Sequence, residues 1–471
     1  MTDGDRQQTL ATVWGEFSQS TGFHGVNKLA NGNKLRCLFW LCSFLACAVY
    51  LTYVIIQELG NYYNYPTYTT LEVERHSEIE FPAVTICNLN SLSKSLVLND
   101  SRVDNYYLSI GPRQIFGMYN EFNWSDPFYE QNGFFKNRTV EEILLEHKEL
   151  HKGLFNSFMF DQTPYFYSEE YFSVELKPNG PCLTSNKTKI FKTSYTGSEY
   201  NFVMWLNVDR KNSYFGQWLG EGVQFTVHDK EEDPHFQGSS GYYIEPGHEY
   251  YGALRKYTYE YLSEPFRATP TEFCRESFED GKKYLSTKCW KECYVSYIYG
   301  ACKCIDFDYK DYPICSKYEY FKCARPAKGE FYGNSKMKTG CHCPPACSST
   351  RYEVTLSSSI FPSDFYNDFL LKAVNEFEQD YYRKNFIVIH IYFDELKTTI
   401  VKQLPVYGSS VEIFGNLGGQ MGLFLGASIL TITELGEFLG FVLWFIWKKC
   451  KNRNRTNFSK EKNVIATLQE M

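Results

Sequence analysis

The chain has 471 residues, of which 43% are hydrophobic and 18% aromatic, so it contains enough apolar side chains for a large folded core. Its net charge of −7 divides into +1 over residues 1–57, −13 over 58–447 and +5 over 448–471. The acidic middle would concentrate cations near its surface, and nothing in the sequence indicates a nucleic-acid partner. A merely solvated acidic surface explains the same charge.

The N-terminal tail, residues 1–36, is polar at first and ends in basic side chains. It contains His24-Gly25, a pair that by itself is typical of an ordinary loop. The next 20 residues, Cys37 to Ile56, have no charge, and this is the length that a helix needs to cross a bilayer. The run begins too late for a signal peptide and lacks a small-residue cleavage pattern, so we predict a retained transmembrane helix over 37–57.

The middle of the chain, about residues 58–410, has the marks of an extracellular domain. Basic residues lie outside both apolar segments of the chain, so the positive-inside rule places both termini in the cytosol. The middle has twelve cysteines, an even number that is typical of disulfides. It also has four N-glycosylation sequons, at Asn99, Asn123, Asn137 and Asn186.

Short runs rich in Val, Ile, Thr, Tyr and Phe predict strands in this middle region. They lie at residues 81–87, 202–208, 223–228, 352–357 and 385–393. Apolar residues near helical spacing predict helices at 271–284, in the cysteine-rich stretch, and at 364–382. The sequence therefore predicts a mixed α+β domain, and it shows no internal repeat.

Ten of the twelve cysteines crowd between Cys274 and Cys347. The triplet Cys341-His342-Cys343 could bind zinc in a reducing compartment, but disulfides are favoured outside the cell. Their spacing suggests nested bridges between two antiparallel segments, although spacing alone does not fix the connectivity.

Two histidines, His147 and His151, lie at i and i+4, but the acid of the metalloprotease motif is one position late. We therefore predict a surface helix at this position. We also expect no metal centre and no enzyme activity, because no catalytic motif is present.

The second apolar segment, Ile413 to Trp447, is 35 residues long and has only two charges, Glu434 and Glu437. About 20 helical residues cross a bilayer, so this segment must tilt, extend past the lipid or break. Two carboxylates at membrane depth favour a cation pathway. Glycines at helical spacing form one smooth face, which an anchor helix that dimerises would also need. These glycines are Gly415, Gly419, Gly422 and Gly426.

Residues Gly415 to Ser428, GNLGGQMGLFLGAS, resemble the second transmembrane segment of the degenerin/epithelial sodium channel superfamily, most closely its acid-sensing branch. Phe81 to Asn88 and Leu356 to Ser363 resemble two further motifs of this superfamily, so the resemblance covers nearly the whole chain. It implies a membrane protein with two transmembrane helices that flank a large disulfide-rich α+β extracellular domain, in a trimeric channel.

The resemblance also implies a role for individual residues. These roles are the selectivity filter at Gly426, Ala427 and Ser428; the gate, or degenerin site, at Gly415, Asn416 and Gly419; a pore-lining amiloride position at Gly422; lower pore acids at Glu434 and Glu437; and a gating motif at His24 and Gly25. Acid-sensing relatives usually have an acid where this chain has Asn416, so the inherited energetics of the gate are in doubt.

The resemblance implies a disulfide-braced thumb over residues 271–350 and one further long bridge. The implied pairs are Cys87–Cys182, Cys274–Cys347, Cys289–Cys343, Cys293–Cys341, Cys302–Cys323 and Cys304–Cys315. One more extracellular pair found in relatives is absent from this chain. Such a ladder would stiffen the lever between an outer sensor and the pore, and each bridge could add about 2–4 kcal/mol of stability.

The stimulus is the least determined property. Acid-sensing relatives place carboxylates on both the thumb and an upper loop, where shared protons raise a pKa. Glu231, Glu232 and Asp233 match the loop side and are the proton-sensing candidates, but Arg325 and Lys328 stand where relatives have thumb acids. Extracellular histidines could respond to protons instead. Gating by a peptide, constitutive opening and mechanical gating stay open.

We therefore predict a voltage-independent, amiloride-sensitive, sodium-selective channel subunit at the plasma membrane, modulated by protons or another extracellular ligand. We expect a homotrimer or a heterotrimer with related subunits, no cofactor beyond the permeant Na⁺, and H⁺ and Ca²⁺ as candidate modulators. The predicted divisions are 1–36, 37–57, 58–410, 411–447 and 448–471. A two-span receptor or adhesion protein is the alternative from another class, although an anchor would not need the two membrane acids.

Overall fold

A computed structural model describes residues 10–448 of the chain. It leaves out 31–32, 90–92, 95–99, 104–125, 133–134, 136–137, 147–151, 156, 178–179, 214–219, 233–240, 308, 310–311, 335–339 and 375–377. The chain forms two compact units. Residues 1–68 and 405–471 form one, which we call the membrane unit, and residues 69–404 form the other, the extracellular unit.

The membrane unit consists of helices. They are α1 (Leu10–Ser20), α2 (Val26–Ala30), α3 (Lys34–Tyr63), α14 (Ser410–Leu425) and a C-terminal helix (Ile429–Lys448). Two of them, α3 and the C-terminal helix, are long and apolar enough to cross a membrane, as the sequence predicted. At 30 residues α3 is about 45 Å long, so it extends beyond a hydrocarbon core of about 30 Å.

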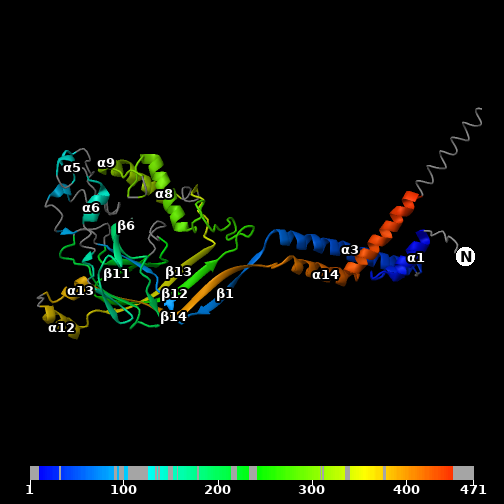
Figure 1. The fold of residues 1–471 in the computed structure, drawn as a ribbon, viewed down its shortest axis with the longest axis horizontal. Helices are drawn as coiled ribbons and strands as arrows, with labels where there is room; N and C mark the ends of the chain where they lie inside the picture. Colours follow the sequence, from blue (N-terminus) through cyan, green and yellow to red (C-terminus); the bar gives the residue numbers. More distant parts are fainter. Residues whose placement is uncertain are drawn as a thin grey trace, which may run out of the picture. The chain divides into compact units, whose positions relative to one another are not determined.

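The second apolar segment is not one continuous helix. Figure 1 shows α14 and the C-terminal helix as separate segments, coloured orange and red. Helix α14 ends at Leu425, and the C-terminal helix begins at Ile429. Of the three arrangements that the length of the segment allowed, a break part-way is the one that the chain adopts.

The extracellular unit is built on two β-sheets. The larger has the order β13-β12-β14-β9-β4-β5, with β1 also paired to β14. Its strands are β1 (Thr67–Arg75), β4 (Ser157–Phe160), β5 (Thr163–Phe166), β9 (Phe202–Asn207), β12 (His248–Glu260), β13 (Ser348–Ile360) and β14 (Phe386–Pro405). Strand β12 runs antiparallel to β13 and parallel to β14, and the three lie side by side in Figure 1.

The smaller sheet has the order β11-β10-β3-β7-β6. Its strands are β3 (Ala83–Asn88), β6 (Phe172–Lys177), β7 (Gly180–Ser185), β10 (Val223–His228) and β11 (Tyr242–Ile244), and a separate pair joins β2 (Ile79–Glu80) to β8 (Lys192–Thr193). Every residue of β3 and β10 is buried, so both faces of these strands are covered. One hydrophobic core, which includes Phe158, Phe202, Phe225 and Phe393, has members from both sheets.

The remaining helices of the described chain lie at the edges of these sheets and in the cysteine-rich stretch. They are α5 (Phe128–Gln131), α6 (Val140–Glu146), α8 (Ser286–Cys302), α9 (Lys317–Glu319), the π-helix η3 (Tyr320–Ala324), α10 (Arg325–Gly333), α12 (Asp364–Val374) and α13 (Tyr381–Asn385). The predicted strands are confirmed, with β13 and β14 longer than expected. The predicted helix at 147–151 lies outside the described residues.

The predicted helix at 271–284 is wrong. This segment forms a hairpin around Gly281, whose φ of +76° suits glycine, and Phe278 N–H donates to Lys282 O. Arg275 exchanges backbone hydrogen bonds with Pro345 and Cys347, which holds the segment extended. The prediction of one helix over 364–382 is also wrong, because α12 ends at Val374 and α13 begins at Tyr381.

The structure forms the same six disulfides that the family resemblance implied. They are Cys87–Cys182, Cys274–Cys347, Cys289–Cys343, Cys293–Cys341, Cys302–Cys323 and Cys304–Cys315. Five of them lie in the thumb, where α8 is bonded to the returning segment at Cys341 and Cys343. Around them, Tyr294, Ile298 and Phe331 form a separate small core.

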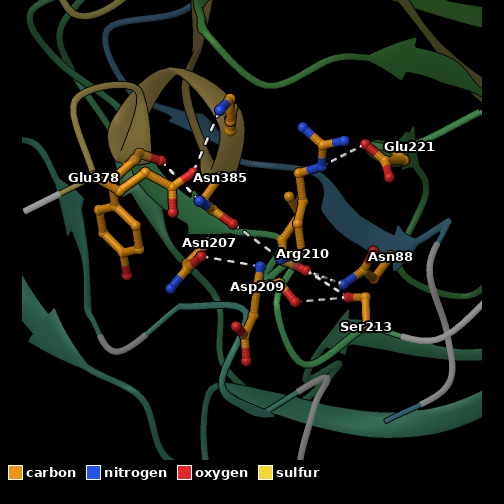
Figure 2. A network of polar contacts seen from close by, with 11 residues as sticks. Asn88, Asn207, Asp209, Arg210, Ser213, Glu221, Glu378 and Asn385 are labelled. Atoms are coloured by element: carbon orange, nitrogen blue, oxygen red, sulfur yellow. Dashed lines mark hydrogen bonds and ion pairs between the residues drawn. The ribbon is translucent and has the colours of Figure 1, made fainter. Parts of the chain in front are cut away.

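A polar joint at residues 207–210 connects the two sheets. Figure 2 shows two asparagine side chains that accept hydrogen bonds from its backbone amides. Asn207 Oδ1 accepts from Asp209 N at 3.0 Å, and Asn385 Oδ1 accepts from Arg210 N at 2.9 Å. Asn88 of β3 donates to Val208 O at 3.5 Å. The joint therefore links β9 of the larger sheet to β3 of the smaller one and to the end of α13.

A buried ion pair lies inside the thumb. Asp306 is 5% exposed, and its Oδ2 accepts the Tyr294 hydroxyl at 2.6 Å and lies 3.4 Å from Lys328 Nζ. Burial acts to lower the pKa of Lys328, but Asp306, Tyr320 and Tyr332 together raise it above its usual value. Lys328, one of the two basic residues that stand where relatives have thumb acids, therefore pairs with an acid inside the thumb.

We predict that Lys328→Met destabilises the thumb, because it leaves the Asp306 carboxylate buried without its cation. The expected loss is about 3 kcal/mol, at the low end for a broken buried pair because Lys328 is 27% exposed. The readout is thermal unfolding of the detergent-solubilised chain. Lys328→Met with Asp306→Asn should recover most of the loss, and Lys282→Met, which breaks an exposed pair, is the control. An unchanged midpoint for Lys328→Met would contradict the assignment.

Candidate pore segment and extracellular acid site

The break in the second apolar segment is a helix end followed at once by a helix start. Gly426, with φ +66°, is the left-handed cap of α14, and Gly426 N–H and Ala427 N–H donate to Gly422 O and Met421 O. The first of these bonds, from Gly426 N–H to the carbonyl four residues earlier, is the αL helix ending, which favours glycine because a Cβ would be strained there. The sequence places this glycine at the first position of the predicted filter.

Ser428 is the residue that caps the start of the C-terminal helix. Its Oγ accepts Thr431 N–H at 3.3 Å, and the Thr431 hydroxyl lies 3.1 Å from both Ser428 N and Ser428 Oγ. A serine whose side chain receives the amide three residues later is a typical N-cap, and here Thr431 returns the interaction. The two capping patterns, back to back, explain why the chain breaks at Gly426–Ser428 and resumes as a helix.

The glycines of α14 form a face without side-chain cover. A Cβ placed on Gly415, Gly418, Gly419 or Gly422 would meet no other group of the described chain within 4 Å. Asn416 lies beside the first of them. This open face has room for a neighbouring helix or a narrow water-filled path, as the glycine spacing predicted.

The predicted gating pair packs against the break. His24 N–H donates to Leu425 O at 2.9 Å, and a Cβ on Gly426 would lie only 2.6 Å from His24 Cγ. Gly25 has φ +85°, and a Cβ there would meet the Trp40 ring of α3 at 2.8 Å. His24-Gly25 is therefore brought to the predicted filter, although the two segments are about 400 residues apart.

The two membrane acids have different surroundings. Glu434 is half-buried, and its Oε2 accepts Gly22 N–H at 3.3 Å. The side chain of Glu437 is exposed, and within the described part of the chain its carboxylate makes no hydrogen bond or ion pair. The sequence did not single out Gly22 or Thr431, although the Ser-x-x-Thr spacing is a capping signal.

The comparison with known proteins decides the family of this two-span arrangement. The family described as "Amiloride-sensitive sodium channel" matches residues 17–438. The chain belongs to this family. It is therefore an ion channel chain and not an enzyme, with two membrane spans around a disulfide-rich extracellular domain. Membrane channels of this family assemble as trimers of related subunits.

Individual relatives agree over most of the channel chain. The bile acid-sensitive ion channel of Mus musculus is 29% identical over 463 residues, covering 92% of this chain and 88% of that protein. Acid-sensing ion channel 1A of Danio rerio is 28% identical and covers 93% and 89%, respectively. Acid-sensing ion channel 1 of Gallus gallus is 27% identical and covers 97% and 89%.

The loop acids of this channel lie after β10. Glu231 is exposed and pairs with Lys283 at 3.3 Å, so a thumb-base cation, not a thumb acid, faces it. Glu232 is half-buried, and burial first, then the neighbouring Asp229, raises its pKa against the opposing effect of Arg351 and Lys283. Asp233 lies outside the described residues.

A cavity of about 610 Å³ adjoins Glu232, a size typical of small-molecule sites. The ends of β10 and β12, the start of β13 and the start of α8 line it, and its tyrosines include Tyr259 and Tyr352. Arg351 at its edge is exposed, with its guanidinium carbon 5.4 Å from the centre of the Tyr259 ring. The cavity therefore presents charges of both signs together with aromatic surface.

Of the predicted glycosylation sites, Asn186 is described. It follows β7, is half-exposed, and accepts hydrogen bonds from Thr188 N and Thr188 Oγ1 at 3.1 and 2.9 Å. Its side chain is near the surface, as a glycan would require. Asn99, Asn123 and Asn137 lie outside the described residues.

We predict that Glu232→Gln stabilises the extracellular unit at neutral pH. When the pKa of a carboxyl group is higher in the folded than in the unfolded protein, its ionisation destabilises the fold, so stability falls as pH rises from the unfolded pKa to the folded one. The folded pKa of Glu232 lies above the usual value of 4.5. The thermal midpoint of the variant should therefore exceed that of the parent chain at pH 7, and the difference should shrink toward pH 4.5. Glu231→Gln, at an exposed site, is the matched control. A constant difference at all pH values would contradict the prediction.

Proposed function

We propose that the chain is a subunit of a voltage-independent, sodium-selective, amiloride-sensitive channel at the plasma membrane, with both termini in the cytosol. The observation that carries this proposal is the capped break at Gly426–Ser428. Such a break frees backbone carbonyls of the last helical turn, and irregular backbone at membrane depth is tolerated where it lines a water-filled path. Carbonyl oxygens there can replace part of the hydration shell of a sodium ion.

The site roles follow from this proposal. Gly426, Ala427 and Ser428 form the selectivity filter, and Gly415, Asn416 and Gly419 form the gate above it. Gly422, on the open face between them, is the amiloride position. Glu437, with its exposed carboxylate, attracts cations below the filter. We propose no resident cofactor, and Na⁺ is the permeant ion.

The stimulus that we propose is extracellular, either protons or another ligand, with Ca²⁺ as a candidate modulator. The raised pKa of Glu232 supports a proton response, and the mixed charge of the adjoining cavity supports a small ligand. Some relatives are named for sensitivity to acid and others for sensitivity to bile acids. The disulfide-braced thumb would transmit the stimulus, because it resists deformation.

The test is whole-cell current from the chain expressed alone, with external pH stepped from about 8 to 5 and with amiloride present or absent. We expect an inward sodium current that amiloride blocks and that does not depend on voltage steps. Current on acidification supports protons as the stimulus, and standing current at pH 8 supports constitutive opening. Silence at every pH would exclude protons as the sole stimulus, and a current that amiloride does not block or that potassium carries as well as sodium would contradict the proposal.

We predict that Glu437→Gln lowers single-channel sodium conductance by up to about five-fold, the range of an exposed charge worth 0.2–1 kcal/mol. The reduction should be largest at low ionic strength, because salt screens an exposed carboxylate. Single-channel recording measures it, with Glu412→Gln before the glycine face as a comparison. A conductance equal to that of the parent at low salt would remove Glu437 from the pore.

We predict that Gly415→Trp increases standing current several-fold, because a bulky side chain on the open face would separate neighbouring chains at the gate. A Cβ at this position would meet no other group of the described chain within 4 Å. Phe414→Trp, one position away and already exposed, is the control of similar bulk. The readout is the amiloride-blocked current at pH 8. Equal currents from both variants would exclude a gate at Gly415.

A further inference from the structure

The N-terminal segment of the membrane unit contacts the second span at three levels. At the first, His24 lies against the break at Leu425–Gly426. At the second, Gly22 N–H donates to Glu434 Oε2. At the third, the Phe17 ring of α1 stacks on Phe438 of the C-terminal helix, with ring centres 4.5 Å apart. The segment therefore runs along the second span from Leu425 to Phe438.

The middle contact is tightly fitted. A Cβ on Gly22 would lie 2.9 Å from the Thr431 hydroxyl oxygen, closer than real Cβ atoms approach. That hydroxyl is also the group that caps Ser428 in the filter segment. Gly22, Thr431 and Ser428 therefore form one chain of contacts, and Thr431, 3% exposed, is fixed between the other two.

A backbone amide that donates to a carboxylate forms a charge-assisted hydrogen bond, and at 3.3 Å the bond from Gly22 N to Glu434 Oε2 is a long one. Within the described residues, Glu434 makes this bond and no ion pair. An ionised carboxylate at membrane depth is costly without such a donor, and Gly22 supplies one. Glu437 has no comparable donor in the described chain, so the two acids three residues apart have different tasks.

We infer that Glu434 is a positioning residue: its carboxylate holds Gly22, and through Gly22 it keeps His24 against the filter. The inference deepens the channel function proposed above, on which its current readout rests. It separates Glu434 from Glu437, which the sequence grouped as lower pore acids. If Glu434 acted only as a charge for passing cations, an amide in its place would be as harmful as an alkyl group.

The first test compares Glu434→Gln, which keeps an oxygen acceptor, with Glu434→Leu, which has similar size and no acceptor. We expect the sodium-to-potassium permeability ratio of Gln to stay within about two-fold of the parent, and that of Leu to fall about ten-fold, the effect of one lost hydrogen bond to a charge. Glu437→Leu is the matched control and should keep the ratio while lowering conductance. Equal losses in Gln and Leu would overturn the inference.

The second test does not depend on current. Thr21→Cys, in a full chain in which Cys37, Cys42, Cys47 and Cys450 are replaced by serine, is labelled with a membrane-impermeant maleimide from the cytosolic side of inside-out membrane vesicles. We expect Glu434→Leu to label about ten-fold faster than the parent, and Glu434→Gln and Glu437→Leu to label at the parent rate. Equal labelling of the parent and Glu434→Leu would overturn the inference even if the channel function holds.

A third variant pair tests the fit at Gly22. Gly22→Ala should displace the segment and speed labelling of Thr21→Cys, because the new methyl group meets the Thr431 hydroxyl. Adding Thr431→Ala removes that hydroxyl and should return labelling toward the rate of Thr431→Ala alone. Additive effects of the two substitutions would mean that they do not touch. Size-exclusion chromatography of each variant identifies those that fail to assemble.

Discussion

The structure depends on one constraint: a backbone at membrane depth must have its polar groups satisfied. The chain meets it at Gly426–Ser428 by ending one helix with a glycine cap and starting the next with a serine cap. Both caps use local hydrogen bonds, so the break needs no lipid-exposed polar group. In the function proposed above, carbonyls at this break would line a cation path.

The N-terminal segment packs against this break and against the helix that follows it. Glu434 and the Leu425 carbonyl accept its amides at Gly22 and His24, so the N-terminal tail is part of the membrane unit. The small size of Gly22 and Gly426 is what permits the approach, since a Cβ on either would collide with Thr431 or His24. The break at Gly426–Ser428, the N-terminal tail and the C-terminal helix are thus packed together, so a shift of any one must disturb the others.

In the extracellular unit, two acidic side chains are paired with lysines. Lys328 is directed at the buried Asp306, and Lys283 pairs with the loop acid Glu231. Both carboxylates therefore meet cations, in keeping with the basic residues that stand where acid-sensing relatives have thumb acids. Glu232 is the exception, because burial and Asp229 disfavour its charge. A proton response in this channel would accordingly differ in its residues from the paired-carboxylate arrangement implied by the acid-sensing branch.

The sequence by itself determined the features that depend on local residue patterns. The length and apolarity of two segments predicted the spans, short runs rich in Val, Ile, Thr, Tyr and Phe predicted the strands, and the motif around the second span identified the family. The helix predicted at 271–284 does not form, because Asp280-Gly281 makes a turn and distant residues 345–347 pair with this segment. Only the tertiary structure could bring His24 and Gly22 to Gly426 and Glu434, or turn Lys328 toward Asp306. These contacts join residues far apart in sequence or on separate elements, and no local pattern encodes such a distance.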